Sequence, residues 1–393
     1  MKFQLSDDQK SIADGLKQIL AGLVTDESLK ALKKEGAWFH ERAWAALAEA
    51  EMLGLALPDS HGGSGFGMLE LCLLLEQVGR TVAPIPAIET LVSAALPIAQ
   101  FGTDAQKQRF LPGIANGSVI LTAALVDGGS RDPFVPADTA VKDAQGYRVT
   151  GMFTNVAYLA QSQRVLLAAK TDGGVVVGLL DPKAAGVTVG VQRGTNTEPL
   201  SQLTLDGALI AADDVLGDAQ QGAGILSFGV QRTLVGMAAM QYGVARQALI
   251  MSAKYATERK QFGQPIGMFQ AVKQRLGDAY VDVQCMEVSM LQAAFKLDAE
   301  RDAAADILTA KFWAADGGQR VLFAAQHIHG GMGFDRDYPL FRYFLKGKHL
   351  EFTLGGANET LERLGLLLAA SWLMKSAGAR EDESTRVFGA GNW

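Results

Sequence analysis

This chain is best interpreted outward from one stretch, Arg259-Lys260-Gln261-Phe262-Gly263-Gln264-Pro265-Ile266-Gly267, which continues into Gln270. The stretch joins two long segments whose apolar residues recur every three or four positions, as on the buried face of a helix. One such stripe runs from Met237 to Tyr255 and the other from Val272 to Ala294. Two long helices joined by so short a connection are antiparallel, and helices of this length suit a four-helix bundle.

The composition is that of a globular protein with two or three domains. Of the 393 residues 48% are hydrophobic and 20% charged, a balance that argues against extended disorder. The net charge of -6 gives no sign of a nucleic-acid surface, because phosphate binding requires a basic patch. Cys72 and Cys285 lie in apolar helical runs, so we expect buried thiols in a reducing compartment.

Nothing in the sequence predicts secretion or membrane insertion. The residues from Met1 to Asp8 turn acidic before an apolar core can form, which is not how a secretory leader is built. The most hydrophobic segment, Leu364 to Met374, is far shorter than the ~20 residues that a membrane helix needs. We therefore expect a soluble, cytoplasmic protein.

Changes in the hydrophobic period divide the chain into three parts. Residues 1–118 have helical periodicity, residues 119–217 carry short β-branched or apolar runs separated by turns, and residues 218–393 return to longer helical patterns. The predicted fold is multi-domain α+β. It has an N-terminal helical domain, a middle antiparallel β-barrel or sandwich and a C-terminal four-helix bundle.

A second stretch, His327-Ile328-His329-Gly330-Gly331-Met332-Gly333-Phe334, follows another helical run. Together with Arg259–Gln270 it resembles the two flavin-binding signatures of the acyl-CoA dehydrogenase family. Helix, barrel and helix is also the arrangement of that family, so the resemblance covers nearly the whole chain. It implies FAD as the cofactor and α,β-dehydrogenation of an acyl-CoA thioester as the reaction.

By this resemblance, Arg259 and Gln261 reach the diphosphate of a flavin bound mainly by the neighbouring subunit, with Phe262 and Gln270 as companions. Arginine suits this task because its planar guanidinium pairs with two phosphate oxygens at once. The structural alternative is that Arg259 only complements the dipole at a helix end. If the flavin role holds, cofactor binding requires a dimer.

The second signature implies flavin contacts at His327, with a one-residue ambiguity toward Gln326, and along the backbone of Gly330 and Gly331. Glycine permits the close main-chain approach that such a contact needs. The histidines form no metal motif, because no carboxylate spacing around them suggests zinc. Gly356 and Asn358 are assigned to the flavin in the same way.

Two segments of the β region also resemble the family. Ala124–Ser130 matches a loop at the flavin pyrimidine edge, where Val126 replaces the usual threonine and keeps only the backbone N–H. Met152–Asn155 matches a flavin-contacting strand and assigns Phe153 and Thr154 to the cofactor. The alternative for Thr154 is an ordinary strand threonine.

Substrate contacts are assigned to Ser130, in the same loop, and to Arg232, which opens the first long bundle helix. The family places the matching arginine near the acyl-CoA pocket. A solvent-exposed arginine at a helix start is the alternative for Arg232.

No catalytic residue is identified. A thioester α-proton is weakly acidic, so a carboxylate within hydrogen-bond reach must take it. Leu354 stands where many family members carry the catalytic glutamate, and Gln231 stands at the alternative base position. Neither side chain accepts a proton. Glu351, one helical turn before Leu354, and Glu359 are weak candidates, and solvated glutamate is the plainer interpretation of Glu351.

Three explanations of the missing base remain. In the first, a partner chain supplies the carboxylate, as in family members that are built from two unlike subunits, including those that act on steroid side chains. In the second, a nearby carboxylate shifts into the pocket. In the third, the chain catalyses related flavin chemistry or has lost its activity. We favour the first. The expected assembly is a homo- or hetero-tetramer, a dimer of dimers, with an electron-transfer flavoprotein as acceptor.

Two other functions are open. The chain is either a non-catalytic subunit that completes another chain's flavin site or a flavin monooxygenase or oxidase on the same fold.

Overall fold

The helices of the N-terminal segment begin at capping residues. In the computed structural model, which describes residues 4–388, the side chains of Ser6, Thr25 and Thr103 each accept a hydrogen bond from the backbone three residues on, and the residue there returns one. Such capping boxes satisfy N–H groups that a helix start leaves free. The elements are α1 (Asp7–Leu23), α2 (Asp26–Lys34), α3 (Glu41–Glu49), α4 (Met68–Thr81), a π-helix (Ala87–Ala94), α5 (Ala95–Phe101) and α6 (Asp104–Ala115).

The N-terminal segment is built around α4, which packs against α1 and against the long helix α7 (Gly222–Glu258). Nearly all of α4 is buried, which explains why its sequence is apolar on most sides. Glycines let α4 and α7 approach closely. A Cβ added at Gly79 would lie 2.0 Å from the carbonyl oxygen of Met240, and one at Gly243 would lie 2.0 Å from that of Glu76.

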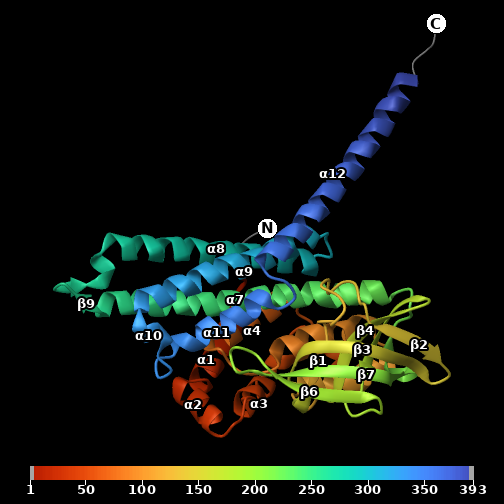
Figure 1. Cartoon of the computed structure of the whole chain (residues 1–393), viewed down its shortest axis with the longest axis horizontal. Coiled ribbons are helices and arrows are strands. Elements are labelled where there is room, and N and C mark those ends of the chain that lie inside the picture. Colours follow the sequence, from red (N-terminus) through yellow and green to blue (C-terminus); the bar gives the residue numbers. More distant parts are fainter. Residues whose placement is uncertain (1–3, 389–393) are drawn as a thin grey trace.

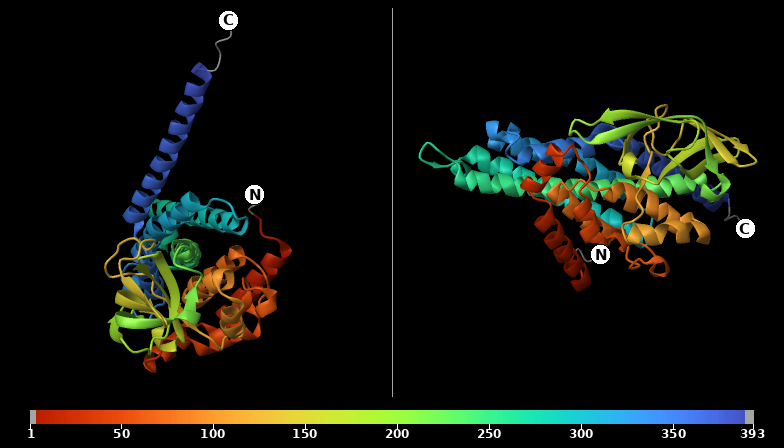
Figure 2. Two further views of the ribbon diagram at one scale, coloured as in Figure 1. Left: turned by 90° about the vertical axis from the view of Figure 1, so that its right-hand side faces the viewer. Right: turned by 90° about the horizontal axis from the view of Figure 1, so that it is seen from below.

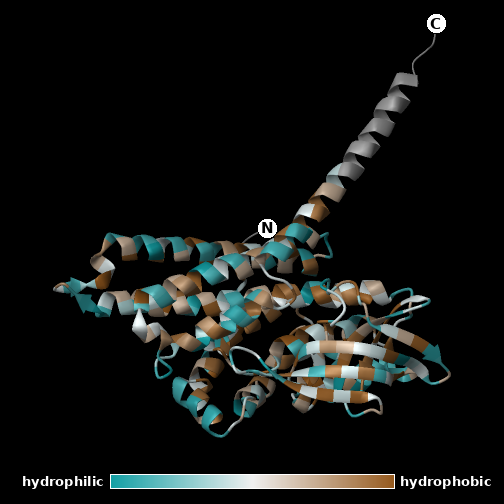
Figure 3. Cartoon of the chain, viewed as in Figure 1, coloured by the Kyte–Doolittle hydropathy of each residue, from teal (hydrophilic) through white to brown (hydrophobic). Residues whose placement is uncertain are grey.

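The middle segment folds into an eight-stranded sheet in the order β6-β7-β3-β2-β4-β5-β8, with β1 beside β4. Its strands alternate between buried apolar and more exposed residues, visible as interleaved bands in Figure 3. The strands are β1 (Leu121–Ala123), β2 (Thr139–Asp143), β3 (Gly146–Ala157), β4 (Arg164–Thr171), β5 (Gly174–Leu180), β6 (Val187–Arg193), β7 (Pro199–Ala211) and β8 (Val215–Leu216).

Most strand pairs are antiparallel, as predicted, but β1 and β2 both run parallel to β4. β1 pairs with the first residues of β4, and Thr139 of β2 pairs with Lys170 near its end. The two strands therefore share one edge of β4, and residues 124–138 between them leave that edge as a loop. The sequence pattern does not predict β2, because only Ala140 of its residues is buried.

The C-terminal segment is a bundle of long helices. Figure 1 shows α7, α8 and α9 side by side, with the β9–β10 hairpin at one end and the sheet at the other, and the views in Figure 2 agree. α12 leaves the body of the protein in both figures. The remaining elements are β9 (Lys260–Gln261), β10 (Gln264–Pro265), α8 (Gln270–Asp298), α9 (Ala304–His329), α10 (Gly331–Phe334), α11 (Leu340–Phe352) and α12 (Ala357–Phe388).

The two apolar stripes of the sequence lie on α7 and α8, which pack against each other, and the predicted fold class is confirmed. By length and composition, α7 is apolar enough to cross a membrane. However, 67% of its apolar window is buried inside the described protein, against α4 and α9 among others. α7 is therefore a core helix.

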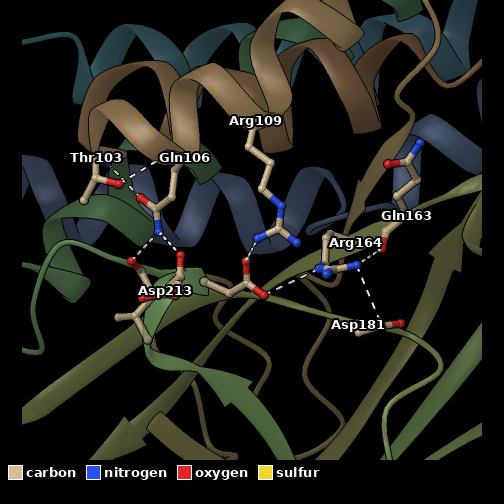
Figure 4. Close-up of polar contacts among 9 residues, drawn as sticks. Thr103, Gln106, Arg109, Gln163, Arg164, Asp181 and Asp213 are labelled. Carbon is tan, nitrogen blue, oxygen red and sulfur yellow. Dashed lines mark hydrogen bonds and ion pairs between the residues drawn. The ribbon is translucent and has the colours of Figure 1, made fainter. Parts of the chain in front are cut away.

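Polar contacts hold α6 on the sheet (Figure 4). The side-chain amide of Gln106 donates to two backbone carbonyls next to β8, both at 2.8 Å. Asp214 lies between two guanidinium groups, 2.8 Å from Arg109 Nη1 and 3.6 Å from Arg164 Nε. These contacts fix the helical N-terminal segment relative to the sheet, whose loop 124–138 forms part of the site described next.

Candidate active site

A cavity of about 680 Å³ opens between the sheet and the end of α11. Its walls come from loop 124–138, from the connection between β6 and β7, and from the turn that joins α11 to α12. Val126, Ser130 and Leu354, which the sequence assigned to the flavin, the substrate and the missing base, all line it. The fold thus brings together residues more than two hundred positions apart in the chain.

Loop 124–138 is shaped by one buried carboxylate. Asp127 accepts hydrogen bonds from the backbone N–H groups of Gly129 at 2.7 Å, Ala137 at 2.6 Å and Asp138 at 2.9 Å. These bonds draw the two ends of the loop together, so that Val126 and Ser130 are presented on the cavity side. Asp127 therefore acts in the structure as a loop-closing group.

Asp138 adds a second carboxylate to this loop. It accepts a hydrogen bond from the backbone N–H of Met152 at 3.0 Å, and a Cβ at Gly151 would collide with it at about 2.0 Å. Burial and, to a smaller extent, the neighbouring Asp127 together raise the pKa of Asp138 to about 6, against the hydrogen bond from Met152, which lowers it. The carboxyl group thus titrates at higher pH than an exposed aspartate.

The strand residues assigned to the flavin lie directly behind this loop. The N–H of Thr154 donates to the carbonyl of Val126 at 2.9 Å, so this backbone donor is already used within the protein. The side chain of Thr154 is partly exposed. Phe153 is 2% exposed and packs in the core of the sheet, so only its main chain could contact a ligand.

Leu354 forms part of the opposite wall. Its side chain is 8% exposed and belongs to the hydrophobic core, and its backbone has a φ of 58°, in the left-handed region that side chains with a Cβ rarely adopt. The turn is held from α12, where Arg363 Nη1 donates to the Leu354 carbonyl at 3.2 Å. The wall is therefore apolar at the position that the resemblance assigns to the base.

The other candidate bases are engaged elsewhere. The carboxylate of Glu351 is 2.6 Å from Lys348 Nζ. Glu359 lines the cavity, but its Oε2 accepts a hydrogen bond from the N–H of Gly356 at 3.0 Å and so caps the start of α12. Asn358 is exposed in the first turn of the same helix. Gln231, half-buried on α7, is not among the residues that line the cavity.

Arg232 also lies outside the cavity lining. Its guanidinium carbon is 3.3 Å from the centre of the Phe228 ring, and its Nη1 donates to the Phe228 carbonyl at 3.4 Å. Burial lowers the pKa of Arg232 to about 10, while Asp298 and Glu300 raise it. Its substrate role stays a prediction.

A buried polar cluster that was not predicted from the sequence lies beside the cavity. His349, which lines the cavity, has its Nε2 3.8 Å from Glu198 Oε2, and Lys346 Nζ lies 3.3 Å from the same oxygen. Burial alone would raise the pKa of Glu198, but Lys346, His349 and Asn196 lower it to about 2. Burial lowers the pKa of His349. No motif marks these residues, because they come together from a loop and a helix far apart in sequence.

The remaining flavin residues gather at the other end of the bundle. Arg259, Gln261, Phe262 and Gln270 are all exposed on or beside the β9–β10 hairpin, and Phe262 is 93% exposed. Figure 3 shows that this end of the bundle is rich in hydrophilic residues. Among the side chains that the structure describes, those of residues 4–372, Arg259 forms no ion pair.

The second signature lies at the same end as the hairpin. The ring of His329 stacks on Tyr255, one turn before Arg259, with centroids 4.3 Å apart, and its Nε2 is 3.1 Å from the hydroxyl of Tyr338. His329 is therefore a structural residue, whereas His327 is exposed.

Two glycines of this second signature, Gly330 and Gly331, have open space next to their backbone. A Cβ added at Gly330 or Gly331 would meet no atom within 4 Å. Gly330 also has φ 57° and ψ -133°, a conformation essentially restricted to glycine.

These two groups of residues cannot serve one flavin within one chain. The hairpin and the sheet, against which the cavity lies, are at opposite ends of the bundle in Figure 1, and α7, which runs between these ends with 37 residues, spans about 55 Å. The residues of each group nevertheless fit their expected half of a dinucleotide. The cavity has room for a ring system, and the hairpin end offers a guanidinium with no ion pair to the described side chains, near glycines with free space. A shared flavin therefore requires two chains.

Comparison with known proteins identifies the family. Residues 6–118 match the N-terminal domain of acyl-CoA dehydrogenases, and residues 222–366 match their C-terminal domain. Acyl-CoA dehydrogenase FadE27 of Mycobacterium tuberculosis is 36% identical over 94% of this chain and 99% of its own length. The chain belongs to the acyl-CoA dehydrogenase family. It is an oxidoreductase of that type, and members of the family bind FAD.

Two solved structures are similar over almost the whole chain. One is the ChsE4–ChsE5 complex of Mycobacterium tuberculosis, 36% identical with a TM-score of 0.89, covering 94% of this chain and 99% of the compared chain. The other is a variant of the Tcur3481–Tcur3483 steroid ACAD, 38% identical with a TM-score of 0.88, covering 93% and 99%. Both are named for two chains. The family and the fold expected from the sequence are thus confirmed.

Proposed function

We propose that this chain is one subunit of an FAD-dependent acyl-CoA dehydrogenase, and that an unlike partner chain supplies the carboxylate that removes the α-proton. The proposal is supported by Leu354, which puts a hydrocarbon at the usual base position, and by the other carboxylates near it, which are engaged. It is also supported by similarity to two solved complexes that are named for two chains.

The observation that carries the assembly is the separation of the two flavin half-sites along α7. Because the hairpin with Arg259 cannot reach its own cavity, any flavin it contacts belongs to another chain. The hairpin keeps all the residues that the family uses, whereas the cavity has lost the base. This difference between the hairpin and the cavity is expected of a chain that mainly contributes residues to the flavin site of its partner.

Each half-site would have a distinct task. At the hairpin, Arg259 would pair with pyrophosphate oxygens, with Gln261 and Gln270 beside it, and Gly330 and Gly331 would allow main-chain contact. When bound, FAD supplies the two-electron acceptor that dehydrogenation requires. In the cavity, Val126 would face the ring, Ser130 the thioester, and Leu354 would exclude water, while Thr154 would contact the ring from the strand behind Val126.

The proposal is tested by co-expressing this chain with a sister chain encoded beside it. We expect a yellow complex whose flavin absorbance is bleached by an acyl-CoA under anaerobic conditions. The chain expressed alone should be slow by a factor on the order of 10²–10⁴, the usual contribution of a general base. Equal bleaching rates with and without the sister chain would refute the need for a partner.

A non-catalytic subunit is the second candidate, and the missing base favours it. In that case the cavity of this chain would never hold a reacting thioester, and only the partner's site would turn over. The two candidates differ in flavin content. One flavin per heterodimer in an active complex favours the non-catalytic role, and two favour a cavity in use on each chain.

The proposed assembly and electron acceptor follow from the resemblance to the family. We propose a tetramer that is a dimer of dimers, an electron-transfer flavoprotein as acceptor and a cytoplasmic location. A complex with an electron-transfer flavoprotein is named for one relative, the caffeyl-CoA reductase–Etf subunit CarC of Acetobacterium woodii, which is 26% identical over 82% of this chain.

A further inference from the structure

Lys311, on α9, is a buried lysine behind the cavity wall. Only 1% of its surface is exposed, and no carboxylate among the described side chains, those of residues 4–372, forms an ion pair with it. Its ammonium group donates instead to two backbone carbonyls, that of Leu350 at 2.8 Å and that of Glu351 at 3.3 Å. Burying a cation that has no ion-pair partner costs free energy, so the presence of a lysine at this position needs an explanation.

The two carbonyls belong to the last turn of α11, where a helix leaves acceptors without intrahelical partners. The chain then turns sharply. Thr353 donates through its hydroxyl to the carbonyl of His349 at 2.7 Å, and Leu354 adopts its left-handed backbone conformation. Such a conformation persists only where the surroundings hold it. Lys311 holds this turn from α9, and Arg363 holds it from α12.

We propose that Lys311 is a positioning residue: it fixes the end of α11 and thereby the turn Thr353–Gly355, which forms the cavity wall opposite loop 124–138. All three residues of that turn line the cavity. The inference rests on the proposed function only in taking this cavity as the place where flavin and thioester meet.

Burial alone gives no reason for a lysine at this position. A methionine of similar length would fill the same space without the cost of removing a charge from water. What methionine cannot do is donate to the carbonyls of Leu350 and Glu351. The lysine therefore matters for the local shape of the turn more than for global stability, and this difference can be measured.

The charge on Lys311 depends on pH near neutrality. Burial, helped by Arg363 on α12, lowers its pKa to about 7, against Glu351 on α11 and Glu359 on α12, which raise it. His349 on α11 also interacts with it electrostatically. Because charge-assisted hydrogen bonds are the stronger ones, the turn should be held more firmly below pH 7 than above it.

The test is hydrogen exchange of the full chain, followed by mass spectrometry on peptides that cover the turn. The amides of Thr353 and Gly355 donate to backbone carbonyls in the native turn, so their protection reports its shape. In Lys311→Met we expect protection here to fall about tenfold, with unchanged protection in α8 and a melting temperature no lower than that of the wild type. Lys296→Met, which removes a partly exposed pair with Asp306, is the matched control and should leave the turn unchanged.

The pH readout separates positioning from a merely structural role. Wild-type protection, corrected for intrinsic exchange, should be higher at about pH 6 than at about pH 9, and Lys311→Met should lose this difference. If that variant does not fold, Lys311→Gln, which keeps one donor, takes its place with a smaller loss.

Unchanged protection of the turn in a folded variant would overturn the proposal, as would an equal loss throughout the protein. Flavin content is measured separately. A wild-type complex without flavin would refute the proposed function but not this result.

Discussion

Leu354 combines two features that rarely coincide, a left-handed backbone and a buried apolar side chain facing a cavity. The backbone conformation costs on the order of 1 kcal/mol for a residue with a Cβ. It is maintained by hydrogen bonds to the turn from α9 and α12. The position is thus prepared for a side chain that points into the cavity, and in this chain that side chain cannot take a proton.

Replacement of Leu354 by glutamate should therefore create a base. We expect Leu354→Glu, in flavin-containing protein expressed without the sister chain, to bleach the flavin with an acyl-CoA at least about tenfold faster than the parent chain expressed in the same way. Leu354→Gln has nearly the same shape without a proton acceptor and should show no gain. No gain in Leu354→Glu despite intact flavin binding would show that the pocket has been aligned wrongly.

Asp138 predicts a pH dependence of stability. Because its pKa is raised from 3.8 to about 6 on folding, the folded state keeps a proton that the unfolded state releases. Its contribution to stability is fully present below about pH 4 and is lost as the pH rises through 6. Asp138→Asn should make the free energy of unfolding, measured with urea, flatter across this window. The same slope in both proteins would contradict the assignment.

Individual site residues could be assigned from the sequence where they belong to a recognisable motif, and could not be assigned where they lie outside one. Arg259, Gly330 and Val126 could be assigned because each sits in a motif. Lys311 could not, because a lysine in a helical pattern is usually exposed. Its burial depends on where α11 ends against α9, which no local pattern contains.

Helices α4 and α7 illustrate how elements are joined through glycine. A Cβ at Gly243 would lie 2.0 Å from the carbonyl oxygen of Glu76 and 2.9 Å from the nitrogen of Arg80. Backbone atoms cannot move aside as a side chain can, so Gly243→Ala should separate the helices and destabilise the fold by roughly 2–4 kcal/mol. Thermal unfolding measures this. Gly224→Ala, also on α7 but with free space around it, is the control and should be neutral or slightly stabilising.

The contact between α6 and the sheet depends on Asp214. Its side chain is 11% exposed and accepts from Arg109, with Arg164 also close (Figure 4). Asp214→Ala should lower the free energy of unfolding by about 1–2 kcal/mol, less than a fully buried pair because Arg109 is half-exposed. Asp143→Ala, which breaks an exposed pair with Arg148, should cost less. Equal losses in the two variants would contradict the prediction that the Asp214 contacts between α6 and the sheet contribute more to stability than an exposed ion pair does.

Element types followed from periodicity, but the path of one sheet edge did not. The long stripes on α7 and α8 and the runs of β4 and β5 could be predicted because their burial is regular. β2 could not, since its side chains face solvent. The parallel placement of β1 and β2 depends on Asp127 closing the loop between them, and this is a tertiary contact.

At the scale of the whole molecule, the residues that the sequence assigns to the flavin form two groups that lie far apart. The cavity lies by the sheet and the end of α11, whereas Arg259 and the glycines of the second signature lie at the hairpin end (Figure 1). The chain belongs to the acyl-CoA dehydrogenase family, and the distance between these two groups of residues is what supports our proposal that the flavin site is shared between two chains.

The most direct test is the flavin content of the assembled complex with Arg259→Ala in this chain. We expect the complex to form at its normal size and to lose most of the flavin held at the hairpin, because in our proposal Arg259 binds the pyrophosphate of a flavin that belongs to the neighbouring subunit. Arg148→Ala, an exposed arginine on the sheet, should leave flavin content unchanged. A full complement of flavin in the Arg259→Ala complex would contradict the account.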